Sequence, residues 1–177
     1  PISKDNIRYN KSLGGGILND AGCYPINATR MLFESEPKSV FCDLIIDKET
    51  QVDTKATLLM NFDGNKQSQS SVGYDLEYQS NYELWASDGF LSLTRAYNIP
   101  PDMPARLSIK NSNKNEEILI EPVNHFQLMI EAFGSEIIKS NYKKFNFEED
   151  LLNQAKVMEA CRISNDEKRY VEIKEIK

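Results

Sequence analysis

The chain has 177 residues, of which 40% are hydrophobic and 27% are charged, a composition typical of a globular domain with one core. Its formal net charge of −6 argues against nucleic acid as the main partner, because contacts with phosphates need clustered lysine and arginine side chains. No apolar run approaches the roughly 20 residues of a membrane-spanning helix, so we expect no membrane partner either.

The first predicted element is a loop that leads into a helix. Residues 1–16 are rich in turn-forming residues and end in the three consecutive glycines Gly14–Gly16. Apolar residues then recur at helical spacing from about Asn19 to Phe33. Pro25 lies inside this helix and has no amide hydrogen to donate, so we expect an irregular first turn. Glu36-Pro37 ends the helix.

The three glycines have two possible interpretations. A glycine-rich loop can cradle a phosphate group, but here no strand precedes the loop and no lysine follows at the required spacing. We therefore interpret Gly14–Gly16 as the tight turn that brings the helix to a cleft. The strand, Gly-x-Gly-x-x-Gly turn and helix that mark a dinucleotide-binding domain occur nowhere in the sequence.

From Ser39 onward the spacing of apolar residues changes towards two, which is typical of β-strands. The dipeptides Asp63-Gly64 and Asp88-Gly89 favour tight turns, so the strands on either side of each are expected to run antiparallel. Strands are predicted at residues 40–46, 52–62, 67–74, 81–86, 90–96, 107–110 and 117–123.

Two features of this strand region bear on partners. The segment Asn98–Pro104 contains three prolines and cannot be a central strand, so we expect an extended excursion at the sheet edge. It is either a plain loop or an arm that reaches a neighbouring subunit. In the strand 81–86, Tyr82 and Leu84 share one face and Trp85 lies on the other. Trp85 is either an interface anchor or a core or rim residue.

The last part of the sequence predicts two helices. Asn124 is a typical N-cap and precedes an apolar stripe at helical spacing, and a second helix is predicted from about Glu148 to Ser164. A short strand at 170–173 closes the chain. With no internal repeat or low-complexity tract, the order of elements predicts one α+β domain.

The candidate site lies in the first helix. Asp20 and Tyr24 are four residues apart and therefore share a helical face, and Asn27 and Arg30 follow at helical spacing. A carboxylate and a phenol in one cleft form a proton-transfer pair of the kind that oxidation or reduction of a carbonyl needs. The alternatives are that Asp20 is only a helix N-cap and Tyr24 only a core or surface tyrosine. Arg30 faces elsewhere and is expected to be a structural ion-pair partner.

The stretch Gly-Gly-Gly-x-Leu-x-Asp-x-Gly-x-Tyr-x-x-Asn-x-x-Arg-x-Leu, which begins at Gly14, resembles the C-terminal domain of the Gfo/Idh/MocA family, named after glucose–fructose oxidoreductase and inositol dehydrogenase. The resemblance extends along almost the whole chain through further landmarks in the family's order. These are Asn6-Ile7-Arg8, Glu36-Pro37, Phe62-Asp63-Gly64, Ser87-Asp88-Gly89-Phe90-Leu91 and Asn124-His125-Phe126-Gln127.

This resemblance implies an α+β fold with an open, mainly antiparallel β-sheet and helices on one face, as in the C-terminal domain of glyceraldehyde-3-phosphate dehydrogenase. Residues 1–177 would then be the substrate-binding and oligomerisation domain of an oxidoreductase. Family members carry an N-terminal nucleotide-binding domain that is absent from this sequence and would be a partner of the chain. The resemblance also implies a homo-oligomer that forms through the open sheet face.

The chemistry that the resemblance implies is hydride transfer between NAD or NADP and a sugar or polyol-like carbonyl. The missing domain would bind the cofactor, so the isolated chain is expected to be inactive. Tyr24 occupies a position where many members carry histidine and others tyrosine, and would be the catalytic acid, helped by a lysine of the nucleotide-binding domain. Asp20 would bind substrate hydroxyls or orient Tyr24. Asn27, Arg8 and His125 would contact substrate, although His125 is better explained as a satisfied core or capping histidine.

The cysteines and the single histidine bear on metals and on the compartment. Cys23, Cys42 and Cys161 are odd in number and lack the spacing of metal ligands, which suits a reducing cytoplasm. One histidine rules out a multi-histidine metal site, so we expect no metal. No secretory signal is recognised at the start of the sequence. The alternative function is a non-catalytic binding or assembly module that retains the fold.

Overall fold

The structure is a computed structural model and describes residues 3, 5–138 and 146–177. The chain divides into two compact units. The first comprises residues 1–76 together with 147–177, and the second comprises residues 77–146. Each unit has its own four-stranded antiparallel sheet, and the two units are treated in turn.

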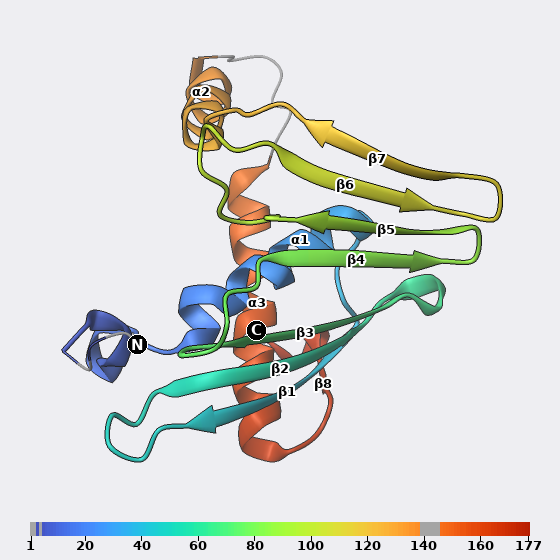
Figure 1. The fold of residues 1–177 in the computed structure, drawn as a ribbon. Helices are drawn as coiled ribbons and strands as arrows, with labels where there is room; N and C mark the ends of the chain where they lie inside the picture. Colours follow the sequence, from blue (N-terminus) through green and yellow to red (C-terminus); the bar gives the residue numbers. More distant parts are fainter. Residues whose placement is uncertain (1–2, 4, 139–145) are drawn as a thin grey trace. The chain divides into compact units, whose positions relative to one another are not determined.

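The sheet of the first unit contains β1 (Ser39–Ile46), β2 (Asp53–Asn61), β3 (Gln67–Gly73) and β8 (Val171–Glu172), in the order β3-β2-β1-β8 (Figure 1). Cys42 pairs with Leu58 and Val40 with Met60, and these four side chains are buried in the core. A 3-10 turn at Asp63–Asn65 joins β2 to β3, with the positive φ of 69° at Gly64 that a tight turn favours. The hairpin predicted at this dipeptide is confirmed.

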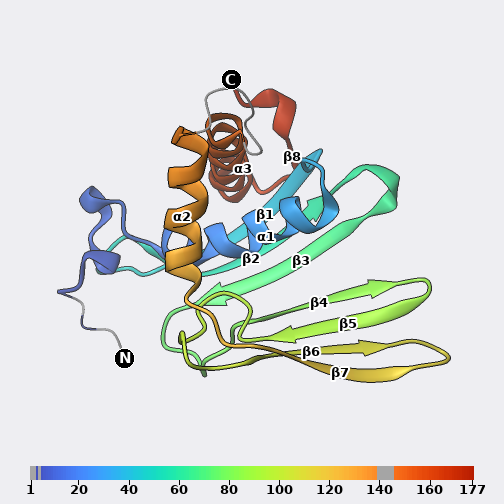
Figure 2. The ribbon, with the colours of Figure 1, turned by 90° about the horizontal axis from the view of Figure 1, so that it is seen from above.

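Two helices cover one face of this sheet (Figure 2). Helix α3 (Phe147–Glu167) packs against β1 and β8, and helix α1 (Cys23–Phe33) packs against α3. Because β8 pairs with only two residues of β1, α3 satisfies the next amides of that strand. The Cys42 amide donates to Ser164 Oγ at 2.9 Å, and the Leu44 amide donates to Asn165 Oδ1 at 2.9 Å. The helix thereby closes an otherwise open strand edge.

The segment before α1 is more ordered than the predicted loop. Short 3-10 turns form at Ile7–Tyr9 and Lys11–Leu13, and Asn6 and Asn10 accept hydrogen bonds at their starts. A π-helical turn, Leu18–Gly22, then runs directly into α1, which is the irregular first turn expected from Pro25. Helix α1 ends after Phe33, where Glu34 adopts a left-handed φ of 49°. A last 3-10 turn, Ile173–Glu175, follows β8.

The second unit contains β4 (Asn81–Ala86), β5 (Gly89–Thr94), β6 (Ala105–Lys110) and β7 (Asn115–Ile120), paired in chain order (Figure 1). Helix α2 (His125–Ile138) follows, and Asn124 Oδ1 accepts from the Gln127 amide at 3.2 Å, which confirms the predicted N-cap. Trp85 is 92% exposed and is therefore no core residue of the described structure.

The proline-rich segment Asn98–Pro104 forms no strand, as predicted, but its position differs from the expectation. It joins β5 to β6, which are the two inner strands of their sheet, so it leaves from the end of the sheet and does not run along an edge. The α+β class and the antiparallel pairing of the strands are confirmed. Among the described residues, no helix is both long and apolar enough to cross a membrane.

Candidate functional site

The glycine turn fixes the position of Arg8 next to the π-helical turn. The amide of Gly16 donates to the Arg8 carbonyl at 2.9 Å, and the amide of Gly15 donates to the Asn10 carbonyl at 2.9 Å. A β-carbon on Gly15 would lie 2.5 Å from the Arg8 oxygen, and one on Gly16 would lie 2.2 Å from Asp53 Oδ1. Only glycine allows so close an approach, because even the smallest side chain would collide with these atoms.

Asp53, at the start of β2, anchors the π-helical turn to the sheet. Its Oδ2 accepts a hydrogen bond of 2.6 Å from the amide of Leu18, one of the donors that a helix start leaves without an intrahelical partner. The sequence analysis gave Asp53 no role, because its partner lies 35 residues away and no local pattern connects them. It is a capping residue supplied by another element.

Asp20 lies within the π-helical turn and binds Arg8. Arg8 Nε donates to Asp20 Oδ2 at 2.7 Å, and both side chains remain partly exposed, Arg8 by 42% and Asp20 by 31%. The hydrogen bond to Asp20 and its negative charge raise the pKa of Arg8. The residues that precede the two helical segments are Ile17 and Gly22, and Asp20 lies inside the π-helical turn, so the N-cap interpretation of Asp20 does not describe this structure.

Tyr24 and Asn27 continue the exposed face that begins at Asp20. Tyr24 follows one helical turn later and is 53% exposed, and Asn27 is exposed one turn further on. Tyr24 is also the last and smallest of the groups that act on the pKa of Arg8, after Asp20, burial and Tyr74. Of the predicted site residues, Arg8, Asp20 and Tyr24 are therefore neighbours, and Asn27 lies beside them on the same helical stripe.

Tyr74, directly after β3, also belongs to this neighbourhood and was missed from the sequence. Its side chain is only 6% exposed, and its hydroxyl makes no hydrogen bond with the described residues. Burial, followed by the negative charge of Asp20, raises the pKa of Tyr74, and the positive charge of Arg8 partly opposes this. The ring packs against that of Tyr9 with 5.4 Å between centroids. A lone tyrosine after a polar strand carries no local signal of such a contact.

Arg30 points away from this face and holds α1 against α3. Its side chain is 4% exposed. Nε donates to one oxygen of Glu36 at 2.6 Å, and Nη2 donates to the other at 2.9 Å. Asp150 and Gln154 of α3 accept further hydrogen bonds, each at 2.8 Å. The predicted structural ion pair is confirmed.

His125 begins α2 in the second unit, and the other predicted site residues belong to the first unit. The His125 ring packs against Phe126 with centroids 4.2 Å apart, and its Nδ1 is buried without a hydrogen bond among the described residues. Its assignment to the substrate site therefore stays a prediction.

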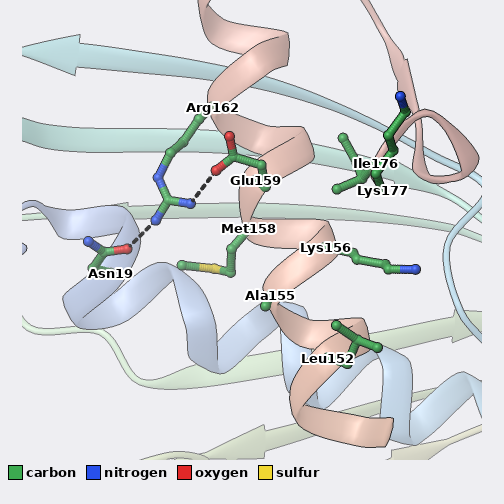
Figure 3. A pocket seen from close by; sticks show the side chains of 9 residues that line it. All are labelled: Asn19, Leu152, Ala155, Lys156, Met158, Glu159, Arg162, Ile176 and Lys177. Carbon is green, nitrogen blue, oxygen red and sulfur yellow. Dashed lines mark hydrogen bonds and ion pairs between the residues drawn. The ribbon is translucent and has the colours of Figure 1, made fainter.

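A surface pocket with a volume of about 460 Å³ lies between α3, Asn19 and the C-terminal residues (Figure 3). Asp20 and Tyr24 do not line it. Arg162 crosses it, donating to Asn19 Oδ1 at 2.6 Å and to Glu159 Oε2 at 3.0 Å, so its charge is already satisfied. In the described part of the chain, no three cysteine, histidine or acidic side chains are grouped as metal ligands would be.

Comparison with known proteins supports the family resemblance of the sequence. The family model of the GFO/IDH/MocA C-terminal domain matches residues 1–92. A D-xylose 1-dehydrogenase (NADP⁺) of Haloferax volcanii is 24% identical over 151 residues, which cover 85% of this chain and 46% of that protein. A dTDP-3,4-didehydro-2,6-dideoxy-α-D-glucose 3-reductase of Actinomadura kijaniata is 26% identical over 162 residues, which cover 92% of this chain and 48% of that protein.

A solved structure gives the same result. The crystal structure of a 3-ketoreductase from Actinomadura kijaniata in complex with NADP and TDP-benzene has a TM-score of 0.84 at 27% identity, over 93% of this chain and 50% of that chain. The present chain therefore spans about half the length of these relatives. With the motif, the fold and the family model in agreement, the chain belongs to the GFO/IDH/MocA family and carries its C-terminal domain.

Proposed function

We propose that this chain is the substrate-binding half of an NAD(P)-dependent oxidoreductase that acts on a sugar or polyol-like carbonyl or carbinol, with Tyr24 as the proton-transferring residue. The observation that carries the proposal is the exposed face on which Tyr24 follows Asp20 by one helical turn, with Arg8 bound to Asp20. The NADP named for two relatives and the sugars named for both curated ones support the cofactor and the substrate class.

The nucleotide itself is expected to bind elsewhere. The amides of Gly15 and Gly16 already donate to the carbonyls of Asn10 and Arg8, so this turn does not present them to a phosphate group. The residues of the chain thus fit a substrate site better than a nucleotide site. A nucleotide-binding domain would be the natural partner, in agreement with relatives about twice as long as this chain.

A nicotinamide cofactor, when bound, would supply the hydride that a carbonyl carbon needs for reduction. Tyr24 donates its phenolic proton to the carbonyl oxygen, and the phenolate left behind regains a proton from solvent. A positive charge near the reacting oxygen would stabilise the negative charge that develops in this step, and Arg8, held by Asp20, is the nearest candidate among the predicted site residues. Asp20 and the exposed Asn27 would accept and donate hydrogen bonds to the hydroxyl groups of the sugar. His125 is kept as a proposed further substrate contact.

Two finer statements are part of the proposal. The first is a homo-oligomer that forms through the sheet of β4–β7, supported by the almost complete exposure of Trp85. The second is a cytoplasmic location, supported by the three free cysteines of the chain. Gel filtration of the Trp85→Ser variant tests the first, since loss of an interface anchor should shift the protein towards the monomer.

The direct test is the Tyr24→Phe variant of the complete gene product that contains this chain. NADPH-dependent reduction of a dTDP-linked keto sugar and NADP⁺-dependent oxidation of D-xylose would be measured. We expect kcat to fall roughly 10²- to 10⁴-fold, because proton transfer by a placed side chain contributes about this much. Tyr170→Phe, another half-exposed tyrosine of the same unit, is the matched control and should leave turnover unchanged. Equal turnover in both variants would exclude Tyr24 as the acid.

The alternative function, a non-catalytic binding or assembly module, makes a different prediction. Calorimetry with NADPH should then give no binding to the complete gene product. Under the proposed function, the complete gene product binds NADPH, whereas residues 1–177 alone do not.

A further inference from the structure

Asn19 is the residue of the π-helical turn that directly precedes Asp20, and its side-chain amide is held on both sides. Nδ2 donates to the Gly14 carbonyl at 2.9 Å, and Oδ1 accepts from Arg162 Nη2 at 2.6 Å (Figure 3). A carbonyl can only accept and a guanidinium can only donate, so the amide fits between them in one orientation. Asn19 therefore ties the glycine turn to Arg162, 143 residues further along the chain.

Arg162 reaches Asn19 from a part of α3 that is fixed to the sheet. Its Nη1 donates to Glu159 Oε2 at 3.0 Å, one helical turn earlier, which holds the guanidinium beside Asn19 (Figure 3). Two residues after Arg162, the fully buried Ser164 accepts from the Cys42 amide of β1 at 2.9 Å. The arginine thus extends from a support that belongs to the core, and the proposed reaction gives it no role.

The turn that Asn19 holds carries both members of the Arg8–Asp20 pair. The Gly16 amide donates to the Arg8 carbonyl at 2.9 Å, and the Asp20 amide donates to the Gly16 carbonyl at 3.0 Å. Arg8 Nε then binds Asp20 Oδ2 at 2.7 Å. A shift of the glycine turn would therefore move the backbone of both residues, and with it the carboxylate that the proposed site presents to substrate.

A purely structural role accounts for the contacts of Arg162 less well. Arg162 is 41% exposed and Glu159 is 52% exposed, and ion pairs this open to water contribute little to global stability. The first helix is already joined to α3 by the almost fully buried Arg30. The bridge from Arg162 to Asn19 therefore contributes more to the orientation of the turn than to the stability of the unit.

We propose that Arg162 is a positioning residue that acts through the amide of Asn19. It fixes the glycine turn to α3 and thereby the orientation of the Arg8–Asp20 pair at the substrate site. A displacement of about 1 Å caused far from the reacting atoms can cost on the order of 10²-fold in rate, so a residue outside the site can control turnover. This inference rests on the proposed function, in which Asp20 contacts substrate beside Tyr24.

The first test compares Arg162→Met with Arg169→Met in the complete gene product, with the same two substrates as for Tyr24→Phe. Arg169 is the matched control, because it is 45% exposed and its ion pairs in the described structure go to Glu167 and Glu175. For Arg162→Met we expect kcat to fall roughly 3- to 10-fold, the value of one hydrogen bond, whereas Arg169→Met should keep the kcat of wild type. Equal kcat values in the two variants would overturn the inference.

A variant of Asn19 shows whether Arg162 acts through this residue. Asn19→Leu removes both hydrogen bonds at similar side-chain size. If Arg162 acts through Asn19, the double variant with Arg162→Met should lose no more kcat than Asn19→Leu alone. Additive losses would contradict the inference, because the two side chains would then act independently. A merely structural role would lower the unfolding temperature of these variants and leave kcat unchanged.

Hydrogen exchange tests the bridge without using turnover. In the complete gene product, Arg162→Met should raise the exchange rate of the segment 14–22 roughly 3- to 10-fold, because the turn opens with one hydrogen bond fewer to break. Arg169→Met should leave this rate unchanged, and mass spectrometry of the peptides measures both. An unchanged rate in Arg162→Met overturns the inference even if Tyr24 proves catalytic. A raised rate in a protein without NADPH-dependent turnover supports the bridge and refutes the proposed function.

Discussion

Two arginines of the motif region, Arg8 and Arg30, illustrate how the same side chain takes two different roles. Arg30 is almost fully buried and donates to both oxygens of Glu36, to Asp150 and to Gln154. Arg8 is 42% exposed, and the carboxylate that it binds, Asp20, is itself exposed on the helix face that carries Tyr24. The cluster around Arg30 is buried, and its charge is paired with several acceptors. The cluster of Arg8 and Asp20, called the open cluster below, is partly exposed and accessible to a ligand.

The difference follows from where α1 meets the rest of the first unit. Its inner face packs against α3, where Arg30 joins the two helices through their polar side chains. Its outer face begins in the π-helical turn, which packs against β2 and β3. Such turns inside helices are frequent at functional sites. Saturation of hydrogen bonds, and not the residue type, distinguishes the structural Arg30 from Arg8, which we propose contacts substrate.

The largest effect that this comparison predicts concerns stability. Arg30→Met should lower the free energy of unfolding by about 2–3 kcal/mol, because it leaves two carboxylates and an amide without their shared donor. The loss stays below that of a fully buried pair, since Glu36 and Asp150 can regain water. Arg8→Met should cost about 0–1 kcal/mol, the range of an exposed ion pair. Urea unfolding of the two variants measures both losses of free energy. Similar losses for Arg30→Met and Arg8→Met would contradict the distinction between a structural and an exposed arginine.

The glycine turn offers the next largest effect. Gly16→Ala should destabilise the protein by about 2–3 kcal/mol, because Gly16 has a φ of 119° and its β-carbon would collide with Asp53. Asp53 would then lose its hydrogen bond to Leu18.

Gly14→Ala is the matched control for Gly16→Ala. Gly14 also has a positive φ, of 76°, but no atom lies within 4 Å of its β-carbon position, so only about 1 kcal/mol of backbone strain is expected. Thermal unfolding of both variants separates strain from collision. A larger loss for Gly14→Ala would show that the contact with Asp53 does not fix the turn.

Much of the fold was accessible from local patterns. Local patterns predicted the strands, the hairpin at Asp63-Gly64, the N-cap Asn124 and the irregular turn before Pro25, and each is confirmed. The ends of the strands were predicted less well, since the strand expected at 117–123 lies at Asn115–Ile120. The division of the strands into two sheets depends on pairings that the alternation of residues does not specify. The predicted position of the proline-rich segment 98–104 was wrong because it, too, depends on which strands pair with each other.

Part of the candidate site could likewise be predicted from the sequence. Asp20, Tyr24 and Asn27 share a face because helical spacing requires it, and the structural role of Arg30 followed from that spacing as well. The contacts of Asp53 and Tyr74 were not accessible, since each joins residues more than 30 positions apart. Whether His125 joins the site stays a prediction, because it belongs to the other unit.

The smallest expected effect is a pH dependence that reports on the open cluster. Burial and the charge of Asp20 raise the pKa of Tyr74 in the folded state, whereas in the unfolded chain it titrates near 10. Below pH 10 both states keep the phenolic proton, and the stabilising contribution is fully present. Above pH 10 the unfolded chain releases this proton first, so the free energy of unfolding falls as pH rises.

Tyr74→Phe should remove this contribution, so between pH 10 and 11 wild type should lose about 1 kcal/mol more stability than the variant. Urea unfolding at the two pH values measures the difference, and the other tyrosines cancel because both proteins contain them. Burial alone also raises the pKa, so Asp20→Asn serves as the control that isolates the charge. Without the carboxylate, Tyr74 of the folded protein should titrate at a lower pH, so in Asp20→Asn the loss should level off at a lower pH than in wild type. If both proteins level off at the same pH, the carboxylate does not act on Tyr74. Arg8 and Asp20 would then form an isolated surface ion pair, and the open cluster would end at the helix face.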